Sequence, residues 1–262
     1  MNSINTRYAV ITGASQGIGE HLTKHLATMG YSVILASRNF GKLSQLAEDL
    51  EKKRGIKALP IECDLSLESG VQKLIEFCSS DTHEIEVFIN NAGFGDLGEF
   101  TEQTWEVFAQ MIDLNIKALT QLSHFFAIRF KQRKRGFILN VASTAAFQPD
   151  PYFSVYGATK AFVLSFSEAL REELAPHGVQ VSVLCPGPTD TPFHLRAGTD
   201  QSLFVTRFMA PVEKVAAKGI TGLFSGKTVI VPGLINNILI LIIRFSPRAA
   251  VARLASLMLR KP

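Results

Sequence analysis

Short apolar runs rich in β-branched residues alternate along the chain with longer stretches in which apolar positions recur every three or four residues. Continuous apolar runs predict strands buried on both faces, and the longer period predicts amphipathic helices. The predicted strands are 8–12, 32–36, 58–61, 87–90, 136–141, 179–184 and 228–231. The predicted helices are 17–29, 40–54, 69–80, 103–131, 154–177 and 211–223. This alternation predicts an α/β fold, a doubly wound, seven-stranded parallel sheet with helices on both faces.

Length and composition agree with one globular domain over residues 1–262. A hydrophobic content of 47% with 19% charged residues excludes a disordered chain, because enough apolar surface is available to offset the ordering entropy. The three cysteines form an odd set without paired spacing, which predicts a reducing compartment rather than a disulfide framework. Residues 1–7 are polar and lack the pattern of a secretory signal, so we expect a cytoplasmic protein.

The charge is divided unevenly along the chain. Residues 1–190 carry 17 basic and 21 acidic groups, whereas residues 191–262 carry 10 basic and 2 acidic groups. Any anionic partner is therefore expected to act on the last quarter of the chain. We expect no nucleic-acid partner, and the histidines and cysteines form no ligand-spaced cluster that would predict a metal site.

A glycine-rich turn directly follows the first predicted strand. Gly13, Gly17 and Gly19 lie in the segment Thr12-Gly-Ala-Ser-Gln-Gly-Ile-Gly, and a helix is predicted to begin inside it. Glycines at such a turn let the backbone and the helix N-terminus approach a pyrophosphate. An ordinary flexible strand-to-helix turn is the alternative, and the position at the first βα junction favours nucleotide binding.

Further motifs follow at the ends of later predicted elements. They are Asn90-Asn-Ala-Gly93, Asn115, Ser143, Tyr156-Gly-Ala-Thr-Lys160 and Pro186-Gly-Pro-Thr-Asp-Thr191. Together with the glycine spacing G-x-x-x-G-x-G, this series over residues 8–191 resembles the short-chain dehydrogenase/reductase family. The resemblance implies a Rossmann-type fold and an oxidoreductase that transfers a hydride between a nicotinamide cofactor and a carbonyl or alcohol.

Tyr156 and Lys160 are four residues apart, so they share one face of a predicted helix. An ammonium about 4 Å from the phenolate would lower the tyrosine pKa from about 10 to about 7 at an effective dielectric of about 20. The resemblance implies that Tyr156 exchanges the substrate proton, that Ser143 hydrogen-bonds the same oxygen, and that Lys160 also binds the nicotinamide ribose. It further implies that Asn115 holds a relay water; the alternative is an amide that satisfies the local backbone.

The end of the second predicted strand bears on cofactor choice. It reads Ala36-Ser-Arg-Asn39, with Ser37 where an acidic residue usually marks NAD. The planar guanidinium of Arg38 suits a 2′-phosphate, which favours NADP over NAD. The alternative is a solvated loop charge, and Gln16 stands where some NADP-using relatives carry a second basic residue.

Several loop residues complete the predicted cofactor site by resemblance. Asp64 and Leu65 would contact the adenine, although a helix N-cap is an alternative role for Asp64. The Pro186 loop would meet the nicotinamide carboxamide, with Thr189 acting mainly through its backbone. The full predicted set is Gly13, Ser15, Gln16, Gly17, Ile18, Gly19, Ser37, Arg38, Asp64, Leu65, Asn91, Ala92, Gly93, Tyr156, Lys160, Pro186, Gly187, Thr189 and Thr191.

The predicted substrate side is apolar. Its expected lining is Phe94, Leu97, Ala145, Phe147, Pro149, Phe153, Phe193 and Leu195, with residues 192–210 as a mobile substrate lid. Such a lining favours a hydrophobic ketone, aldehyde, secondary alcohol or 3-oxoacyl chain over a sugar, although the aromatic residues could equally belong to the core.

Residues 232–262 form an apolar and then basic extension. Val251, Leu254, Ala255 and Met258 form a helical stripe with basic residues around it, and the apolar run is too short to span a membrane. Two alternatives are open: contact with an anionic lipid surface, and burial in a homodimer or homotetramer interface, which the resemblance favours. A regulatory NADP-binding protein or a lipid-associated reductase at a membrane surface are the alternative functions, and the Ser-Tyr-Lys set favours the enzyme.

Overall fold

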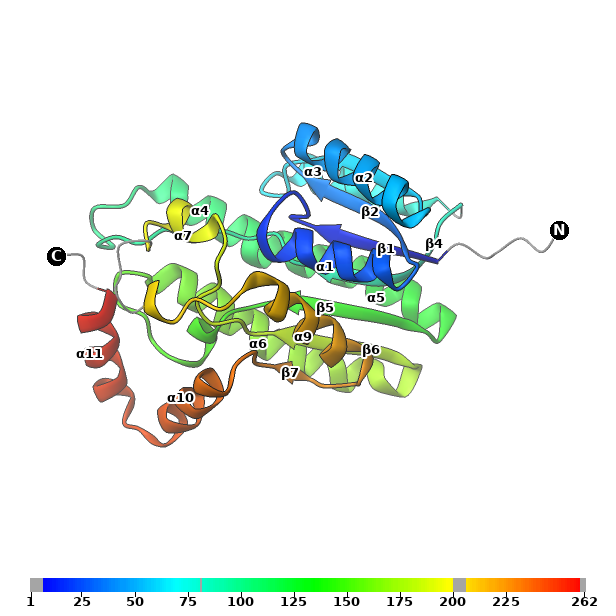
Figure 1. The fold of residues 1–262 in the computed structure, drawn as a ribbon. Coiled ribbons are helices and arrows are strands. Elements are labelled where there is room, and N and C mark those ends of the chain that lie inside the picture. Colours follow the sequence, from blue (N-terminus) through cyan, green and yellow to red (C-terminus); the bar gives the residue numbers. More distant parts are fainter. Residues whose placement is uncertain (1–6, 81, 200–205, 260–262) are drawn as a thin grey trace.

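The computed structural model describes residues 7–80, 82–199 and 206–259. Seven parallel strands form one sheet in the order β3-β2-β1-β4-β5-β6-β7, as Figure 1 shows. The strands are β1 (Arg7–Thr12), β2 (Ser32–Ser37), β3 (Ala58–Glu62), β4 (Glu84–Asn90), β5 (Gly136–Val141), β6 (Val179–Leu184) and β7 (Val229–Ile230). The predicted α/β fold with a doubly wound, Rossmann-like parallel sheet is confirmed.

Helices cover both faces of the sheet. They are α1 (Gly17–Thr28), α2 (Phe40–Arg54), α3 (Glu68–Ser79), α4 (Trp105–Ile112), α5 (Leu119–Arg133), α6 (Ser154–Leu174), α7 (Phe193–Ala197), α9 (Val212–Phe224), α10 (Leu234–Phe245) and α11 (Arg248–Leu259). Helices α1, α2 and α9 pack on one face, and α3, α5 and α6 pack on the other. The alternation of side chains explains both cores: Ala9 and Ile11 of β1 enter the first, and Tyr8 and Val10 enter the second.

The main differences between the predicted elements and the structure concern two strands and one helix. Strand β4 begins at Glu84, three residues before the predicted start, and β7 comprises only two residues. The predicted helix over 103–131 is not uniform, because a π-helical segment, Asp113–Ala118, joins α4 to α5. Asn115 lies in this segment, and its side chain is tied to the backbone of Phe94. The apolar period of the sequence did not distinguish this short π segment from the α-helices on either side of it.

The carboxyl ends of the strands bring the predicted motifs to one edge of the sheet. The order of the strands reverses between β1 and β4, and ligands of open α/β sheets bind at such a switch point. The turns after β1, β4, β5 and β6 meet there, and α7, α10 and α11 lie at the same end of the molecule (Figure 1). Within residues 7–80, 82–199 and 206–259, no helix combines the length and apolar character needed to cross a bilayer.

Candidate active site

A cavity of about 1000 Å³ opens at this edge of the sheet. Every predicted cofactor-binding residue except Gly19 lines it, as do Ser143, Tyr156 and Lys160. Gly19 and Asn115 lie behind the wall, where they support residues that face the cavity. The volume is at the upper end of the range for small-molecule sites, which is enough for an extended ligand and a second one beside it.

The glycine turn after β1 is built for close approach. Gly13 has a φ of +65°, and a Cβ on it would lie 2.8 Å from Nδ2 of Asn91. A Cβ on Gly19 would collide with the carbonyl of Gly13. Asn91 fixes the turn, because its side-chain amide donates to the carbonyl oxygens of Thr12 and Gly13 at 2.9 and 3.2 Å.

The first turn of α1 has no side-chain cap. Its leading backbone N–H groups therefore face the cavity as donors, together with the positive end of the helix dipole. Bare glycine backbone and an uncapped helix N-terminus fit a pyrophosphate group, so the residues present at this site match a dinucleotide cofactor.

Arg38 and Asp64 face each other across the adjoining part of the cavity. A guanidinium nitrogen of Arg38 lies 3.8 Å from Oδ2 of Asp64. Oδ1 of Asp64 accepts hydrogen bonds from the backbone and the hydroxyl of Ser66, at 3.0 and 2.7 Å. Burial alone would raise the pKa of Asp64, but these bonds and the nearby guanidinium groups of Arg38 and Arg196 lower it.

The alternative role of Asp64 as a helix N-cap is wrong. Helix α3 begins at Glu68 with Leu67 at the capping position, and no side chain caps it. Asp64 instead closes a tight turn with Ser66, so Oδ2 is the carboxylate oxygen directed to the cavity side. Asp64 and Leu65 both line the cavity, and their contact with an adenine stays a prediction.

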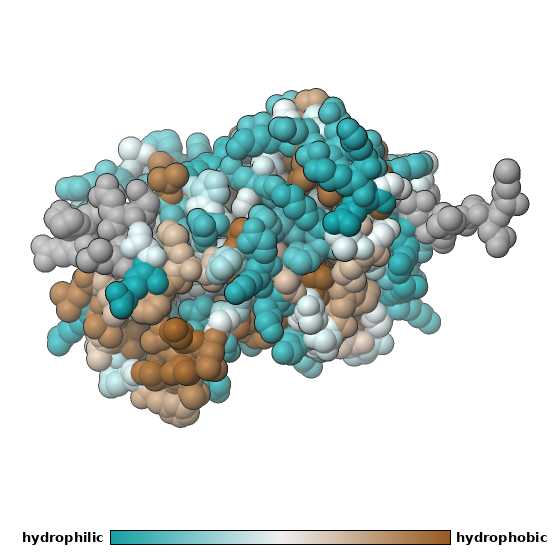
Figure 2. Space-filling model, in the orientation of Figure 1, coloured by the Kyte–Doolittle hydropathy of each residue, from teal (hydrophilic) through white to brown (hydrophobic). Residues whose placement is uncertain are grey.

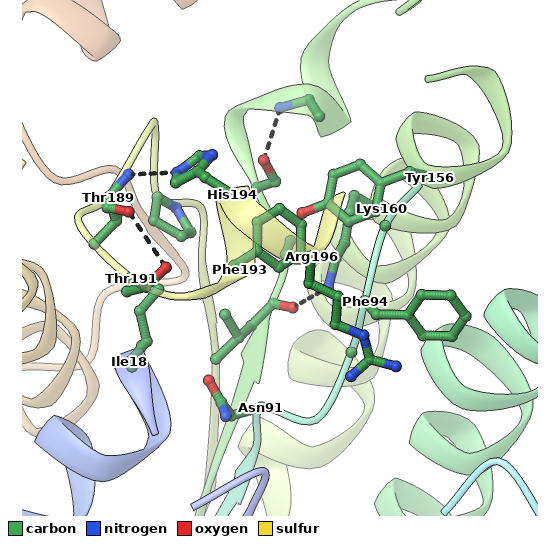
Figure 3. Close-up of a pocket in the computed structure, with 18 of the residues that line it drawn as sticks. Ile18, Asn91, Phe94, Tyr156, Lys160, Thr189, Thr191, Phe193, His194 and Arg196 are labelled. Atoms are coloured by element: carbon green, nitrogen blue, oxygen red, sulfur yellow. Dashed lines mark hydrogen bonds between the residues drawn. The ribbon is translucent and has the colours of Figure 1, made fainter. Parts of the chain in front are cut away.

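Two basic residues near this region escaped the sequence reasoning. Nζ of Lys42, on α2, lies 3.5 Å from Oε1 of Gln16, so a second cation stands near the position where some NADP-using relatives carry a basic residue. Arg196, on α7, reaches into the cavity with its guanidinium 5.1 Å from the ring centre of Phe94 (Figure 3). Its pKa is lowered by burial and by the charge of Arg38. Only the basic character of the segment after Thr191 hinted at Arg196.

Ser143 follows the end of β5, and Tyr156 and Lys160 lie in the first turns of α6; all three line the cavity. Figure 3 shows Tyr156 and Lys160 side by side there. Tyr156 is 6% exposed and Lys160 5% exposed. Nζ of Lys160 donates to the carbonyl of Val141 at 2.9 Å and lies 5.7 Å from the ring centre of Tyr156. The predicted pair on one helix face therefore projects into the same cavity.

The pKa of Tyr156 does not agree with the value near 7 expected from the sequence. Burial raises this pKa well above its ordinary value, a hydrogen bond with Ser143 partly lowers it, and the charge of Asp150 raises it again. Burial also lowers the pKa of Lys160 to about 8. The value near 7 reflects only the attraction of the ammonium, whereas in the folded protein the desolvation of both groups outweighs it.

Asn115 and Gly93 support the lysine from behind. The side chain of Asn115 accepts from the backbone N–H of Phe94 at 3.1 Å and donates to its carbonyl at 2.9 Å and to the hydroxyl of Thr159 at 3.1 Å. The amide is thus satisfied by local groups, which was the alternative noted for this residue. A Cβ on Gly93 would lie 3.0 Å from Oδ1 of Asn115 and 3.3 Å from Nζ of Lys160.

The loop after β6 closes another side of the cavity. The hydroxyl of Thr189 donates to the carbonyl of Gly187 at 2.9 Å, and that of Thr191 donates to the carbonyl of Thr189 at 3.3 Å. The backbone N–H of Thr189, which was predicted to meet a carboxamide, donates to Nε2 of His194 at 3.3 Å (Figure 3). A carboxamide would gain this N–H only if His194 gave it up.

The substrate side is apolar but differs in membership from the prediction. Of the predicted lining, Phe94, Ala145, Phe153 and Phe193 face the cavity, whereas Leu97, Phe147, Pro149 and Leu195 do not. Leu195 points to solvent and is 73% exposed. The expected lid, 192–210, contributes α7, whose Phe193 ring lies 5.6 Å from that of Tyr156, and its residues 200–205 lie outside the described part of the chain.

The C-terminal helices form a wall that was not expected. The predicted stripe of Val251, Leu254, Ala255 and Met258 is helical, and all four residues line the cavity. Residues of α10 join them, namely Leu239, Ile242 and Ile243. Sequence periodicity predicted the stripe correctly but could not show which surface it covers.

Comparison with known proteins agrees with this geometry. The short chain dehydrogenase family model matches residues 7–202, so the chain belongs to that family. It is 32% identical to an uncharacterized oxidoreductase of Staphylococcus epidermidis over 76% of this chain and 84% of that protein. It is 33% identical to the mouse 17-beta-hydroxysteroid dehydrogenase type 3 over 71% of this chain, which corresponds to 61% of that enzyme.

Solved structures extend the likeness across most of the chain. A short-chain dehydrogenase from Sphingobium yanoikuyae in complex with NADPH superposes with a TM-score of 0.82 at 31% identity, covering 93% of this chain and 97% of that one. A bulky-bulky ketone specific alcohol dehydrogenase from Comamonas testosteroni has a TM-score of 0.79 at 28% identity, covering 94% and 96%. The chain is therefore an oxidoreductase of the short-chain dehydrogenase family that acts on carbonyl or alcohol groups.

Proposed function

We propose that this protein is an NADP-dependent oxidoreductase that interconverts a bulky hydrophobic ketone or aldehyde and its alcohol. The observation that carries the proposal is the convergence of Ser143, Tyr156 and Lys160 in one cavity with an uncapped helix N-terminus and a bare glycine turn. The bound nicotinamide supplies or accepts the hydride. We also propose that residues 1–262 act as one domain in a reducing compartment, where the three buried thiols stay free.

Tyr156 is the proton donor to the carbonyl oxygen and the acceptor in the reverse direction. Its hydroxyl is buried beside Ser143, whose hydroxyl hydrogen-bonds the same substrate oxygen and stabilises charge that develops on it. Lys160 places a cation near the phenolate and so makes loss of its proton easier. Burial opposes the loss of the Tyr156 proton, so the cation does not give Tyr156 a low pKa at rest. It stabilises the phenolate while the proton is being transferred.

Asn115 and Gly93 position Lys160. The amide of Asn115 is engaged with Phe94 and Thr159, so a relay water would bind to its backbone carbonyl, which a π-helical turn can free from the helix ladder. Protons lost at Tyr156 would then reach solvent through Lys160 and this water. Asn115 is thus a positioning residue. Its side chain holds the segment around Phe94 and Thr159 in place, and its backbone carbonyl would bind the relay water.

NADP is favoured over NAD by the charges beside the adenosine end. Ser37 stands where an acidic residue would repel a 2′-phosphate, Arg38 follows it directly, and Lys42 lies nearby on α2. Arg196 adds a third cation from the opposite wall. The related Sphingobium enzyme binds NADPH, which supports the same preference here.

The preference can be measured with Arg38→Ala. A charge-assisted contact with a phosphate contributes about 1.5–3 kcal/mol, so the ratio of NADPH to NADH affinity is expected to fall roughly ten- to hundredfold. Arg54→Ala, which removes an exposed cation at the far end of α2, the helix that follows Arg38, is the matched control. An unchanged ratio in Arg38→Ala would remove the basis for the assignment.

The substrate class follows from the apolar walls of α7, α10 and α11 around Tyr156. The related Comamonas enzyme is specific for bulky ketones and the related mouse enzyme acts on a hydroxysteroid, which agrees with a large apolar substrate. A panel of hydrophobic ketones, followed through NADPH absorbance, tests the proposal. Turnover is expected in the wild type and loss of at least about a hundredfold in Tyr156→Phe. A protein that binds NADPH but reduces no carbonyl would instead be a regulatory cofactor-binding protein.

A further inference from the structure

Nine of the twelve residues of helix α10 are apolar, and yet none of its residues is buried. Leu234 is 76%, Leu241 57% and Phe245 80% exposed. Figure 2 shows the resulting hydrophobic surface, which lies over α10 and continues onto α11. The apolar face of a helix is normally covered, and exposed patches of this kind mark interaction surfaces. This α10–α11 surface therefore implies a partner.

The same surface leads into the catalytic cavity. Four residues of α10 and α11 are both exposed and part of the cavity lining: Leu239, Ile242, Leu254 and Met258. At the inner end, Leu259 packs against the cluster that contains Tyr156. Helix α10 is fixed to the site at its start, because the side chain of Asn236 fills the space that a Cβ on Gly187 would need. An apolar route thus runs from the outer surface to the reacting group.

The charges around the α10–α11 surface favour an anionic partner. Residues 232–262 contain five basic residues and no acidic residue. Arg244, Arg248 and Arg253 are exposed within this stretch. A symmetric contact with a second copy would place these cations against each other, and it would also cover the cavity mouth. An anionic lipid surface complements the cations and leaves the route between α10 and α11 open to apolar molecules.

The dimensions agree with a helix that lies on a membrane. Helix α10 has 12 residues, so it is roughly 18 Å long, which is shorter than the roughly 30 Å hydrocarbon layer of a bilayer. Its apolar sides can enter the boundary between headgroups and acyl chains while Arg244 and the arginines of α11 meet the phosphates.

We propose that the α10–α11 surface docks the protein on an anionic lipid bilayer and that the substrate enters the cavity from that bilayer. The proposal rests on the proposed function and narrows its substrate class to an apolar carbonyl or alcohol dissolved in lipid. The subunit interface that the sequence favoured would block this route, so a second copy is the competing occupant.

The test is sedimentation of the full chain with vesicles of phosphatidylcholine alone or mixed with phosphatidylglycerol. The wild type is expected to bind the mixed vesicles, and to bind less as salt is added. Phe245→Glu changes an exposed residue that does not line the cavity, and it should weaken binding at least about tenfold. Trp105→Glu, 69% exposed on α4, is the matched control and should bind as the wild type does.

Activity separates docking from chemistry. The wild type, Phe245→Glu and Trp105→Glu should all reduce a water-soluble ketone equally. Phe245→Glu alone should lose turnover of a long-chain ketone dissolved in the vesicles. Equal vesicle binding by all three, or none by the wild type, would overturn the proposal even with soluble turnover intact. A wild-type dimer that ignores vesicles and becomes a monomer in Phe245→Glu would assign the surface to a second copy. Vesicle binding without turnover of either ketone would instead refute the proposed function and with it the entry route.

Discussion

Replacing Lys160 by Met removes the cation nearest to the proposed proton donor while keeping most of the side-chain volume. Nζ of Lys160 lies 5.7 Å from the ring centre of Tyr156. At an effective dielectric of about 20, a cation at that distance stabilises a phenolate by about 3 kcal/mol, or about two pKa units. Because burial lowers the pKa of Lys160 to about 8, the amine is mainly charged at pH 7 and contributes this attraction there.

The expected result for alcohol oxidation is a rise of about two units in the apparent pKa below which kcat/KM falls, because the phenolate is the base, with a loss of roughly a hundredfold at pH 7. The profile is measured through NADPH formation at saturating NADP, so that weaker cofactor binding does not enter. Tyr156→Phe defines the background rate. A Lys160→Met profile that has the wild-type pKa and is only scaled down would refute the electrostatic role and leave Lys160 as a cofactor-binding residue.

Two further changes probe the surroundings of the pair. Burial raises the pKa of Asp150 to about 6 from 3.8, so the folded state loses stability as the pH rises from about 4 through about 6. Asp150→Asn should therefore raise the free energy of unfolding in urea at pH 7 by up to about 3 kcal/mol and leave it unchanged near pH 4; equal differences at both pH values would contradict this. Gly93→Ala would press a methyl group against Asn115 and Lys160, and we expect kcat to fall roughly ten- to hundredfold, whereas Gly41→Ala, which has space, should retain it; equal kcat values for the two would contradict the steric argument.

Local patterns were sufficient for the sheet and for most of the candidate site. Continuous apolar runs located all seven strands, because a strand buried on both faces has no polar alternation and is bounded by turn residues. The motifs after these strands had to converge, since the carboxyl ends of parallel strands meet at one edge. Tyr156, Lys160 and Ser143 therefore lie in the same cavity, as their positions along the chain implied.

Features that depend on contacts between distant segments were decided only by the tertiary structure. The pKa of Tyr156 depends on how completely α6 is covered, and spacing along one helix carries no information on that burial. Arg196 approaches Arg38 and Asp64 from α7, more than a hundred residues further along the chain. Neither the burial of Tyr156 nor the approach of Arg196 leaves a periodic signal in the sequence.

The C-terminal extension separates the two kinds of information most clearly. The sequence of residues 232–262 by itself determined two properties, an apolar helical stripe and a surplus of positive charge, because each depends only on residues that are close together along the chain. Where the stripe packs depended on the turn at Ser246 and Pro247, which folds α11 back so that Val251 and Leu254 face the cavity of Tyr156. Packing partners are chosen by shape across the whole fold, so only the tertiary structure joined the exposed apolar helix to the reaction site.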